Sequence, residues 1–287
     1  MADLSGKVAL VTGGGSGINL AFTRLLIEAG CKVLIADLGL HAQAEEWIAS
    51  IESDAEKRAR VHFHKTDVTE WAQLTAAFEA CAEKFGTKAP DIVVPGAGVF
   101  EPTTNSFWGD NDTDSRFKVF DIDLVHPVKL SRMAISRLRE AKKPGAIVHV
   151  SSVAGQFASL SAPLYCIAKH GINAFVWAMA SLEEMCGIRV VAVAPDATKS
   201  PLYNESALAT QLAAANYSVL ETETVAEAMF AVMTQKETYK GGTVLEVCHP
   251  TDWRVVNRLN DPGPQGLPAN VRSKQIEMVG RVLKVDE

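Results

Sequence analysis

Short apolar runs alternate with longer stretches of helical periodicity along most of the chain. Seven runs of four to seven residues are rich in Val, Ile and Ala, and few polar residues interrupt them. A continuous apolar run predicts a strand buried on both faces, which is typical of a parallel sheet covered by helices. The predicted strands are residues 7–12, 32–36, 61–64, 91–94, 146–151, 188–194 and 243–247.

Between these runs, apolar residues recur every three to four positions, which indicates amphipathic helices. Strand–helix alternation with right-handed crossovers gives a doubly wound fold. We therefore expect an α/β protein with a single Rossmann-type domain, in which a parallel seven-stranded sheet carries helices on both faces. The expected helices cover residues 16–29, 41–53, 69–85, about 114–141, 162–185 and 223–235.

The composition is that of a folded globular protein, with 47% hydrophobic and 22% charged residues. The net charge of −6 argues against a nucleic-acid partner, which calls for a basic surface. Five scattered cysteines without a C-x-x-C pair are typical of reduced thiols. We see no signal peptide, and the uncharged run 144–168 is broken by Gly, Pro and Ser, so we expect a cytoplasmic protein with no membrane partner.

A glycine-rich turn follows the first predicted strand and leads into a helix. Its sequence is Gly13-Gly14-Gly15-Ser16-Gly17-Ile18. Glycines let backbone N–H groups approach a pyrophosphate, and the helix N-terminus adds a positive dipole end. A plain tight turn is the alternative, because Ile18 breaks the G-x-G-x-x-G spacing. The position in the first strand–helix unit favours a dinucleotide site.

Asp37 ends the second predicted strand about 20 residues after this turn. A carboxylate there accepts hydrogen bonds from both hydroxyls of an adenosine ribose and repels a 2′-phosphate. No Lys or Arg lies within residues 37–40 to favour that phosphate. A helix N-cap is the alternative role. Together with the glycine-rich turn, Asp37 predicts NAD as the cofactor.

Tyr165 and Lys169 lie four residues apart on one face of a predicted helix, and Ser152 follows the fifth predicted strand. A surface pair is the alternative for Tyr165 and Lys169, but their location at the carboxyl ends of parallel strands is where ligands bind. An unperturbed phenol titrates near pH 10, and a nearby ammonium favours the phenolate. We therefore predict Tyr165 as general acid/base, Ser152 as the group that holds the substrate oxygen, and Lys169 as the group that favours phenolate and holds the nicotinamide ribose.

Several segments, in their order and spacing, resemble the short-chain dehydrogenase/reductase family over about residues 5–250. They are residues 12–18, 67–68, 97–98, 151–152, 165–169 and Pro195. The resemblance implies an NAD(P)-binding oxidoreductase, a homodimer or homotetramer built on two long helices, and a substrate lid over about residues 200–220. The cofactor-binding residues are then Gly13, Gly15, Ser16, Gly17, Ile18, Asp37, Asp67, Val68, Gly96, Ala97, Tyr165, Lys169, Pro195, Thr198 and Ser200.

The chain departs from the family's pattern at four places. Asn19 stands where the family has the last glycine of its phosphate loop, and Pro95-Gly96 replaces a pair of asparagines. Asp123 replaces an asparagine that anchors a relay water to the lysine, so Asp123 joins the catalytic candidates and should pair with Lys169. Asp196 replaces a glycine near the expected carboxamide pocket. These changes predict a slowed or retuned reaction.

The segment after residue 250 differs from the rest. Residues 260–266 are turn-rich, and one short helical pattern follows. Residues 260–264 are similar to those of fungal family members related to 15-hydroxyprostaglandin dehydrogenase. We expect residues 1–250 to form the dinucleotide-binding and catalytic domain, and residues 251–287 to form a C-terminal tail packed on the domain or on a partner subunit.

No metal site is expected. Asp110, Asp112 and Asp114 resemble the start of a calcium loop, but the glycine and glutamate that such a loop requires are absent, so a polar loop with a helix N-cap is favoured. His62 and His64 share a strand face without an evident third ligand, which indicates a structural role.

The leading hypothesis is an NAD(H)-dependent oxidoreductase that interconverts a secondary alcohol and a ketone on a hydrophobic small molecule of fungal secondary metabolism. Apolar residues within 201–220 suggest the hydrophobic substrate, although a packed helix explains them equally well. Asp123 and Asp196 motivate an alternative, a non-redox isomerase or cyclase. A non-catalytic dinucleotide-binding protein is the third hypothesis.

Overall fold

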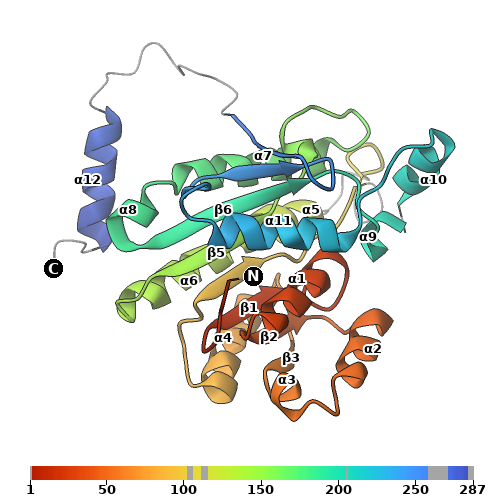
Figure 1. The fold of residues 1–287 in the computed structure, drawn as a ribbon. Coiled ribbons are helices and arrows are strands. Elements are labelled where there is room, and N and C mark those ends of the chain that lie inside the picture. Colours follow the sequence, from red (N-terminus) through yellow and green to blue (C-terminus); the bar gives the residue numbers. More distant parts are fainter. Residues whose placement is uncertain (1, 102–105, 111–115, 205, 258–270, 284–287) are drawn as a thin grey trace.

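A single eight-stranded sheet forms the centre of the protein (Figure 1). The computed structural model describes residues 2–101, 106–110, 116–204, 206–257 and 271–283. The strand order is β3-β2-β1-β4-β5-β6-β7-β8, so the chain crosses back over β1 between β3 and β4. The strands are β1 (Val8–Thr12), β2 (Lys32–Asp37), β3 (Val61–Lys65), β4 (Ile92–Pro95), β5 (Gly145–Val150), β6 (Ile188–Pro195), β7 (Val244–Val247) and β8 (Trp253–Val255).

The seven predicted strands and their parallel pairing are confirmed. Every residue of β1 and β6 is buried, which explains their continuous apolar runs. The eighth strand was not predicted. It pairs antiparallel with β7, with Leu245 opposite Val255 and Glu246 opposite Arg254. Its three residues are partly or fully exposed and form no apolar run that would mark a strand.

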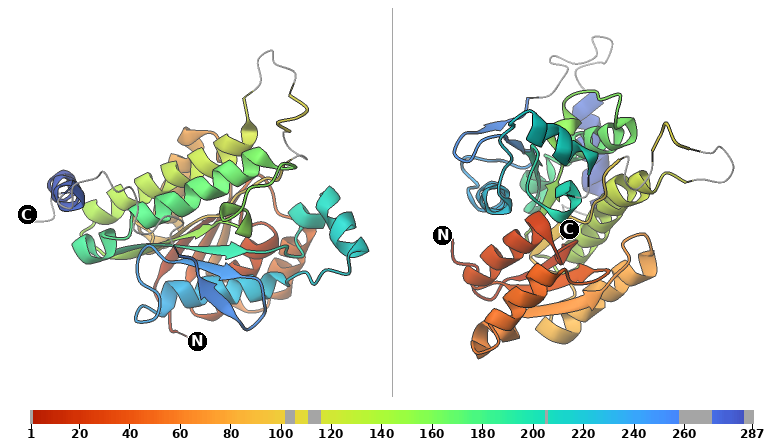
Figure 2. Two further views of the ribbon diagram at one scale, coloured as in Figure 1. Left: turned by 90° about the horizontal axis from the view of Figure 1, so that it is seen from above. Right: turned by 90° about the vertical axis from the view of Figure 1, so that its right-hand side faces the viewer.

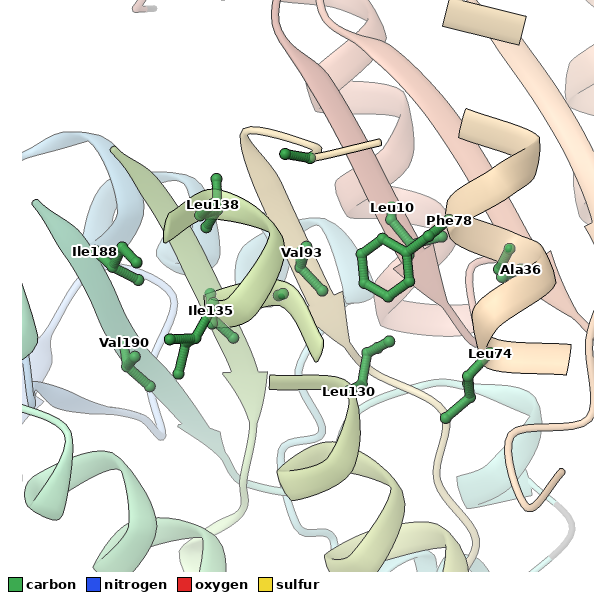
Figure 3. Packing of buried hydrophobic residues seen from close by; sticks show 14 of the residues in the cluster. Leu10, Ala36, Leu74, Phe78, Val93, Leu130, Ile135, Leu138, Ile188 and Val190 are labelled. Carbon is green, nitrogen blue, oxygen red and sulfur yellow. The ribbon is translucent and has the colours of Figure 1, made fainter. Parts of the chain in front are cut away.

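Helices cover both faces of the sheet, as predicted, and Figure 2 (left) shows the resulting layers. One face packs mainly against α4, α6 and α7, and the other against α1 and α11. Figure 3 shows Phe78 of α4 and Leu130 of α6 among the side chains of the first face. The longer helices are α1 (Gly17–Glu28), α2 (Ala42–Ser50), α4 (Trp71–Phe85), α6 (His126–Glu140), α7 (Pro163–Ala178), α10 (Ala207–Ala214), α11 (Thr222–Thr234) and α12 (Val271–Leu283).

Two of the predicted long helices are interrupted, and one is shorter than predicted. The predicted helix 41–53 is shorter, because α2 ends at Ser50, and α3 (Ala55–Ala59) is a further short helix that was not predicted. The predicted helix 162–185 is divided into α7 and α8 (Leu182–Cys186). The predicted helix 114–141 begins only at α5 (Lys118–Phe120), and its expected start at Asp114 lies outside the described residues. Between α5 and α6, residues Asp121–Val125 form a π-helical turn. Such turns are frequent at functional sites, and this one contains the buried Asp123.

The described part of the C-terminal tail contacts the domain. Helix α12 lies beside α8 and the end of α6 (Figure 1), and Arg139 Nε donates a hydrogen bond to the Leu283 carbonyl over 3.2 Å. The turn-rich residues 260–266 lie outside the described residues. Among the helices that the structure describes, none has the length and apolar character needed to cross a membrane.

Candidate active site

A cavity of about 950 Å³ opens at the carboxyl ends of the parallel strands, next to the point where the chain crosses from one side of β1 to the other. Ligands of open α/β sheets bind at this position. The four predicted catalytic residues line it, and so do all predicted cofactor-binding residues except Gly15. These lining residues are Gly13, Ser16, Gly17, Ile18, Asp37, Asp67, Val68, Gly96, Ala97, Asp123, Ser152, Tyr165, Lys169, Pro195, Thr198 and Ser200.

The glycine-rich turn lies against the end of β4. Gly13 has a φ of +67°, and a Cβ atom there would stand 2.6 Å from the Cα of Ala97. Only glycine permits this backbone conformation and this approach. Ser16 is the N-cap of α1, and its side chain accepts no hydrogen bond from the first turn. A phosphate at this helix end would therefore not compete with a protein cap, so the turn fits a pyrophosphate.

Asp37 is held rigidly at the end of β2. Its Oδ2 accepts a hydrogen bond from Gly15 N at 2.9 Å, and its Oδ1 accepts one from Leu38 N at 2.7 Å. Gly15 is thus not part of the cavity wall, but its backbone N–H helps to hold the Asp37 carboxylate in place. Each carboxylate oxygen has a second lone pair, so the residue can accept hydrogen bonds from the hydroxyls of an adenosine ribose.

Tyr165 and Lys169 lie one turn apart on α7, and Ser152 faces the same cavity from the end of β5. The Nζ of Lys169 is 5.2 Å from the centre of the Tyr165 ring. The Oγ of Ser152 accepts a hydrogen bond from Ala154 N at 3.1 Å. Burial raises the pKa of Tyr165 above its ordinary value, while the Lys169 ammonium and a hydrogen bond with Ser152 act in the opposite direction.

Lys169 and Asp123 form a buried ion pair. Their Nζ and Oδ2 atoms are 3.0 Å apart, and only 8% and 1% of the two side chains are exposed. The Oδ1 of Asp123 accepts a hydrogen bond from Val99 N at 2.8 Å, and Lys169 Nζ donates to the Val150 carbonyl at 3.1 Å. Burial opposes the ammonium, but Asp123 and Tyr165 outweigh it, so the pKa of Lys169 is raised. The pairing expected from the sequence is present, and Lys169 is held as a cation.

Sequence reasoning missed Glu101, which is fully buried beside the N-terminus of α7. Its Oε2 accepts hydrogen bonds from Leu164 N at 2.7 Å and from Tyr165 N at 3.1 Å, while its Oε1 accepts one from Phe107 N at 2.9 Å. Ala162, the N-cap of α7, offers no side-chain acceptor. Glu101 therefore caps the helix that carries Tyr165. No local motif marks it as a cap, because its two partners in α7 lie more than 60 residues away.

The predicted lid region borders the cavity and gives it an apolar wall. It contains α9 (Pro201–Asn204) and α10, and its side chains at the cavity include Leu202 and Leu212. The hydroxyl of Tyr217 donates to Asp196 Oδ2, while Ala197 N donates to Oδ1 at 2.7 Å. The hydrogen bond from Tyr217 to Asp196 raises the pKa of Tyr217 to about 12. The Asp196 carboxylate is therefore held by the end of the lid region.

The metal-ligand candidates that the structure describes, His62, His64 and Asp110, do not line the cavity. His62 is in β3 and packs against Phe85, with ring centres 5.4 Å apart. Asp110 is described, whereas Asp112 and Asp114 lie outside the described residues. Within the described ranges, no group of three or more His, Cys, Asp or Glu side chains is arranged to hold a metal ion.

Known proteins resemble the chain over most of its length. A profile described as short chain dehydrogenase matches residues 7–211. The cis-4-hydroxycyclohexanecarboxylate dehydrogenase of Sinomonas cyclohexanicum is 34% identical over 196 residues, which are 68% of this chain and 75% of that protein. The 15-hydroxyprostaglandin dehydrogenase (NAD(+)) of Rattus norvegicus is 30% identical over 69% of this chain and 71% of its own length.

The fold is also similar to that of a solved structure. The crystal structure of levodione reductase superposes with a TM-score of 0.69 at 25% identity and covers 85% of this chain and 96% of that chain. These likenesses agree with the cavity, the glycine-rich turn and the Ser–Tyr–Lys arrangement. The chain therefore belongs to the short-chain dehydrogenase family, as an oxidoreductase that acts on alcohol or ketone groups of small molecules.

Proposed function

We propose that the protein is an NAD(H)-dependent oxidoreductase that interconverts a secondary alcohol and a ketone on a hydrophobic small molecule. Its family uses NAD(P). The observation that carries the proposal is the convergence of Ser152, Tyr165 and Lys169 on the cavity that the glycine-rich turn also borders. Asp37 favours NAD, because a 2′-phosphate would meet its carboxylate.

The glycine-rich turn, Asp37 and Lys169 would hold the cofactor, which would supply or accept the hydride at the carbinol carbon. The chain's own groups act on the substrate oxygen and its proton. Ser152 Oγ holds the substrate oxygen by a hydrogen bond. Tyr165 takes the proton from the alcohol during oxidation and returns it to the ketone oxygen during reduction. Lys169 keeps a positive charge near the phenol and binds the nicotinamide ribose. Asp123 holds that ammonium in place at 3.0 Å.

An apolar substrate suits the apolar side chains that line the cavity. They include Phe100, Phe157, Leu202 and Leu212. Phe100 also packs edge-on against Tyr165, with ring centres 4.9 Å apart. A ring or chain of carbon atoms next to the reacting alcohol would bury its surface against these side chains.

The proposal also covers the enzyme's cellular location, its oligomeric state and its partners. We place it in the cytoplasm as a homodimer or homotetramer built on α6 and α7, with a hydrophobic small molecule as its partner and no nucleic acid or membrane. The likeness of residues 260–264 to fungal relatives supports a role in fungal secondary metabolism.

The test uses purified protein, NAD and a panel of secondary alcohols that differ in hydrophobicity. We expect NADH absorbance to rise with apolar alcohols, and we expect Tyr165→Phe to abolish the rise while NAD binding by calorimetry persists. Unchanged turnover in Tyr165→Phe would exclude the mechanism. Product formation without net oxidation or reduction of the cofactor would instead favour the isomerase or cyclase alternative, which Asp123 and Asp196 motivate.

A further inference from the structure

Asn19, in the first turn of α1, lies directly against Gly96 at the end of β4. The Nδ2 of Asn19 donates a hydrogen bond to the Gly96 carbonyl over 2.8 Å. Only 7% of Asn19 is exposed, and its Oδ1 is buried without a hydrogen-bond partner among the described residues. A buried amide oxygen without a partner carries a cost in free energy, so packing against Gly96 has to offset it.

The amide group of Asn19 occupies the space that a side chain at position 96 would need. A Cβ atom on Gly96 would stand 2.4 Å from Oδ1, 2.5 Å from Nδ2 and 2.6 Å from Cγ of Asn19. All three distances are well below a van der Waals contact. The two positions are therefore coupled sterically, because a side chain at position 96 requires the Asn19 amide to move from its place and to give up its hydrogen bond to the Gly96 carbonyl.

This contact acts on the wall of the cofactor cavity. Both Gly96 and Ala97 line that cavity, and Thr12 Oγ1 accepts a hydrogen bond from Gly96 N at 3.0 Å. Gly13 lies against the backbone of Ala97. The backbone at 96–97 is thus held by β1, by the glycine-rich turn and by Asn19. Asn19 joins this backbone to the first turn of α1, where the pyrophosphate is proposed to bind.

We propose that Asn19 is a positioning residue of the dinucleotide site and forms a coupled pair with Gly96. Its amide fixes the distance between the N-terminus of α1 and the end of β4, and so sets the width of the cavity at the phosphates. The family has a glycine at the position of Asn19 and an asparagine at the position of Gly96, so the two departures from its pattern compensate each other. This inference rests on the proposed binding of NAD.

The test is a double-mutant cycle with Asn19→Gly, Gly96→Asn and the exchanged double variant, measured by calorimetric NAD binding and by urea unfolding. We expect Gly96→Asn alone to weaken NAD binding about tenfold or more, which corresponds to about 1.4 kcal/mol or more of lost binding free energy. We expect the double variant to bind within about threefold of the unchanged protein, which is a coupling of the size found for contacting residues. Gly109→Asn serves as the control, because Gly109 is exposed and a Cβ there would meet only Ser106, at an ordinary contact distance of 3.5 Å.

A second double-mutant cycle with smaller substitutions covers the case in which Gly96→Asn does not fold. Gly96→Ala adds only the colliding Cβ atom, and Asn19→Ala removes the amide that it meets. The proposal requires Asn19→Ala to relieve the damage done by Gly96→Ala, in NAD affinity and in unfolding. Losses that simply add in both measurements would overturn it. Failure of the unchanged protein to bind NAD would overturn the proposed function instead, while the unfolding cycle would still decide whether the pair is coupled.

Discussion

Replacing Glu101 by Gln should weaken the cap that holds Tyr165 in place. The carboxylate accepts three backbone hydrogen bonds of 2.7, 3.1 and 2.9 Å from a fully buried position. A glutamine keeps one oxygen, so it can satisfy the two α7 donors, but its NH₂ group then faces Phe107 N. Phe107 is 47% exposed, so the loss of its hydrogen bond costs about 1 kcal/mol rather than the full penalty of a buried donor, and the loss of charge weakens the two remaining bonds. We therefore expect the free energy of unfolding to fall by about 1–3 kcal/mol.

The same substitution should lower kcat more than it changes cofactor binding. Tyr165 donates its own backbone N–H to Glu101, so a looser cap lets the phenol move relative to the substrate. A displacement of about 1 Å costs up to about 10²-fold in rate. The Kd of NAD, measured by calorimetry, should stay within about twofold, because Glu101 is not among the residues that line the cavity.

Urea unfolding and steady-state kinetics of Glu101→Gln test this reasoning together. Glu56→Gln is the matched control, since the Glu56 side chain is 87% exposed and its Oε1 lies 3.8 Å from Arg60. Such a surface change should stay within about 0.5 kcal/mol. If Glu101→Gln unfolded at the same urea concentration as the unchanged protein and kept its kcat, the cap would not be what positions Tyr165.

Three further outcomes follow from the site. Asp37→Asn should raise the ratio of kcat/KM with NADP to that with NAD by about tenfold, because a 2′-phosphate no longer meets a carboxylate; an unchanged ratio would contradict the role of Asp37. The charge of Asp123 raises the pKa of Tyr165, so Asp123→Asn should lower that pKa. The rising limb of the pH–rate profile for alcohol oxidation should then move to lower pH, and a move to higher pH would contradict this effect of Asp123. Tyr217→Phe should raise the KM of the alcohol about two- to fivefold, the effect of losing one hydrogen bond, with kcat preserved; an unchanged KM would show that the bond to Asp196 does not hold the lid region.

The sequence predicted the parts of the fold that depend on local pattern. A parallel strand covered on both faces has to be apolar along its length, and β1 and β6 show this directly. The glycine-rich turn could be placed because it joins the first strand to a helix. Ser152, Tyr165 and Lys169 could be assembled because parallel strands end at a common edge of the sheet.

Features that depend on long-range contacts could not be predicted in this way. The apolar periodicity runs on beyond Ala178, but α7 ends there, and the turn at Gly241 and Gly242 packs closely against Ala180. Strand β8 is defined by its pairing with β7 rather than by its own composition. Glu101 is an isolated acid in the sequence, and only the folded chain shows that its carboxylate caps α7.

The buried ion pair changes how Tyr165 is controlled. The Lys169 ammonium near the ring favours phenolate, and the carboxylate of Asp123, 3.0 Å from that ammonium, opposes this effect in part. Burial then dominates, and the pKa of Tyr165 lies above its ordinary value. The free protein therefore holds Tyr165 as a phenol, which is the form that donates a proton to a ketone. In the proposed mechanism alcohol oxidation requires the phenolate, and a positively charged ligand in the cavity would favour that form.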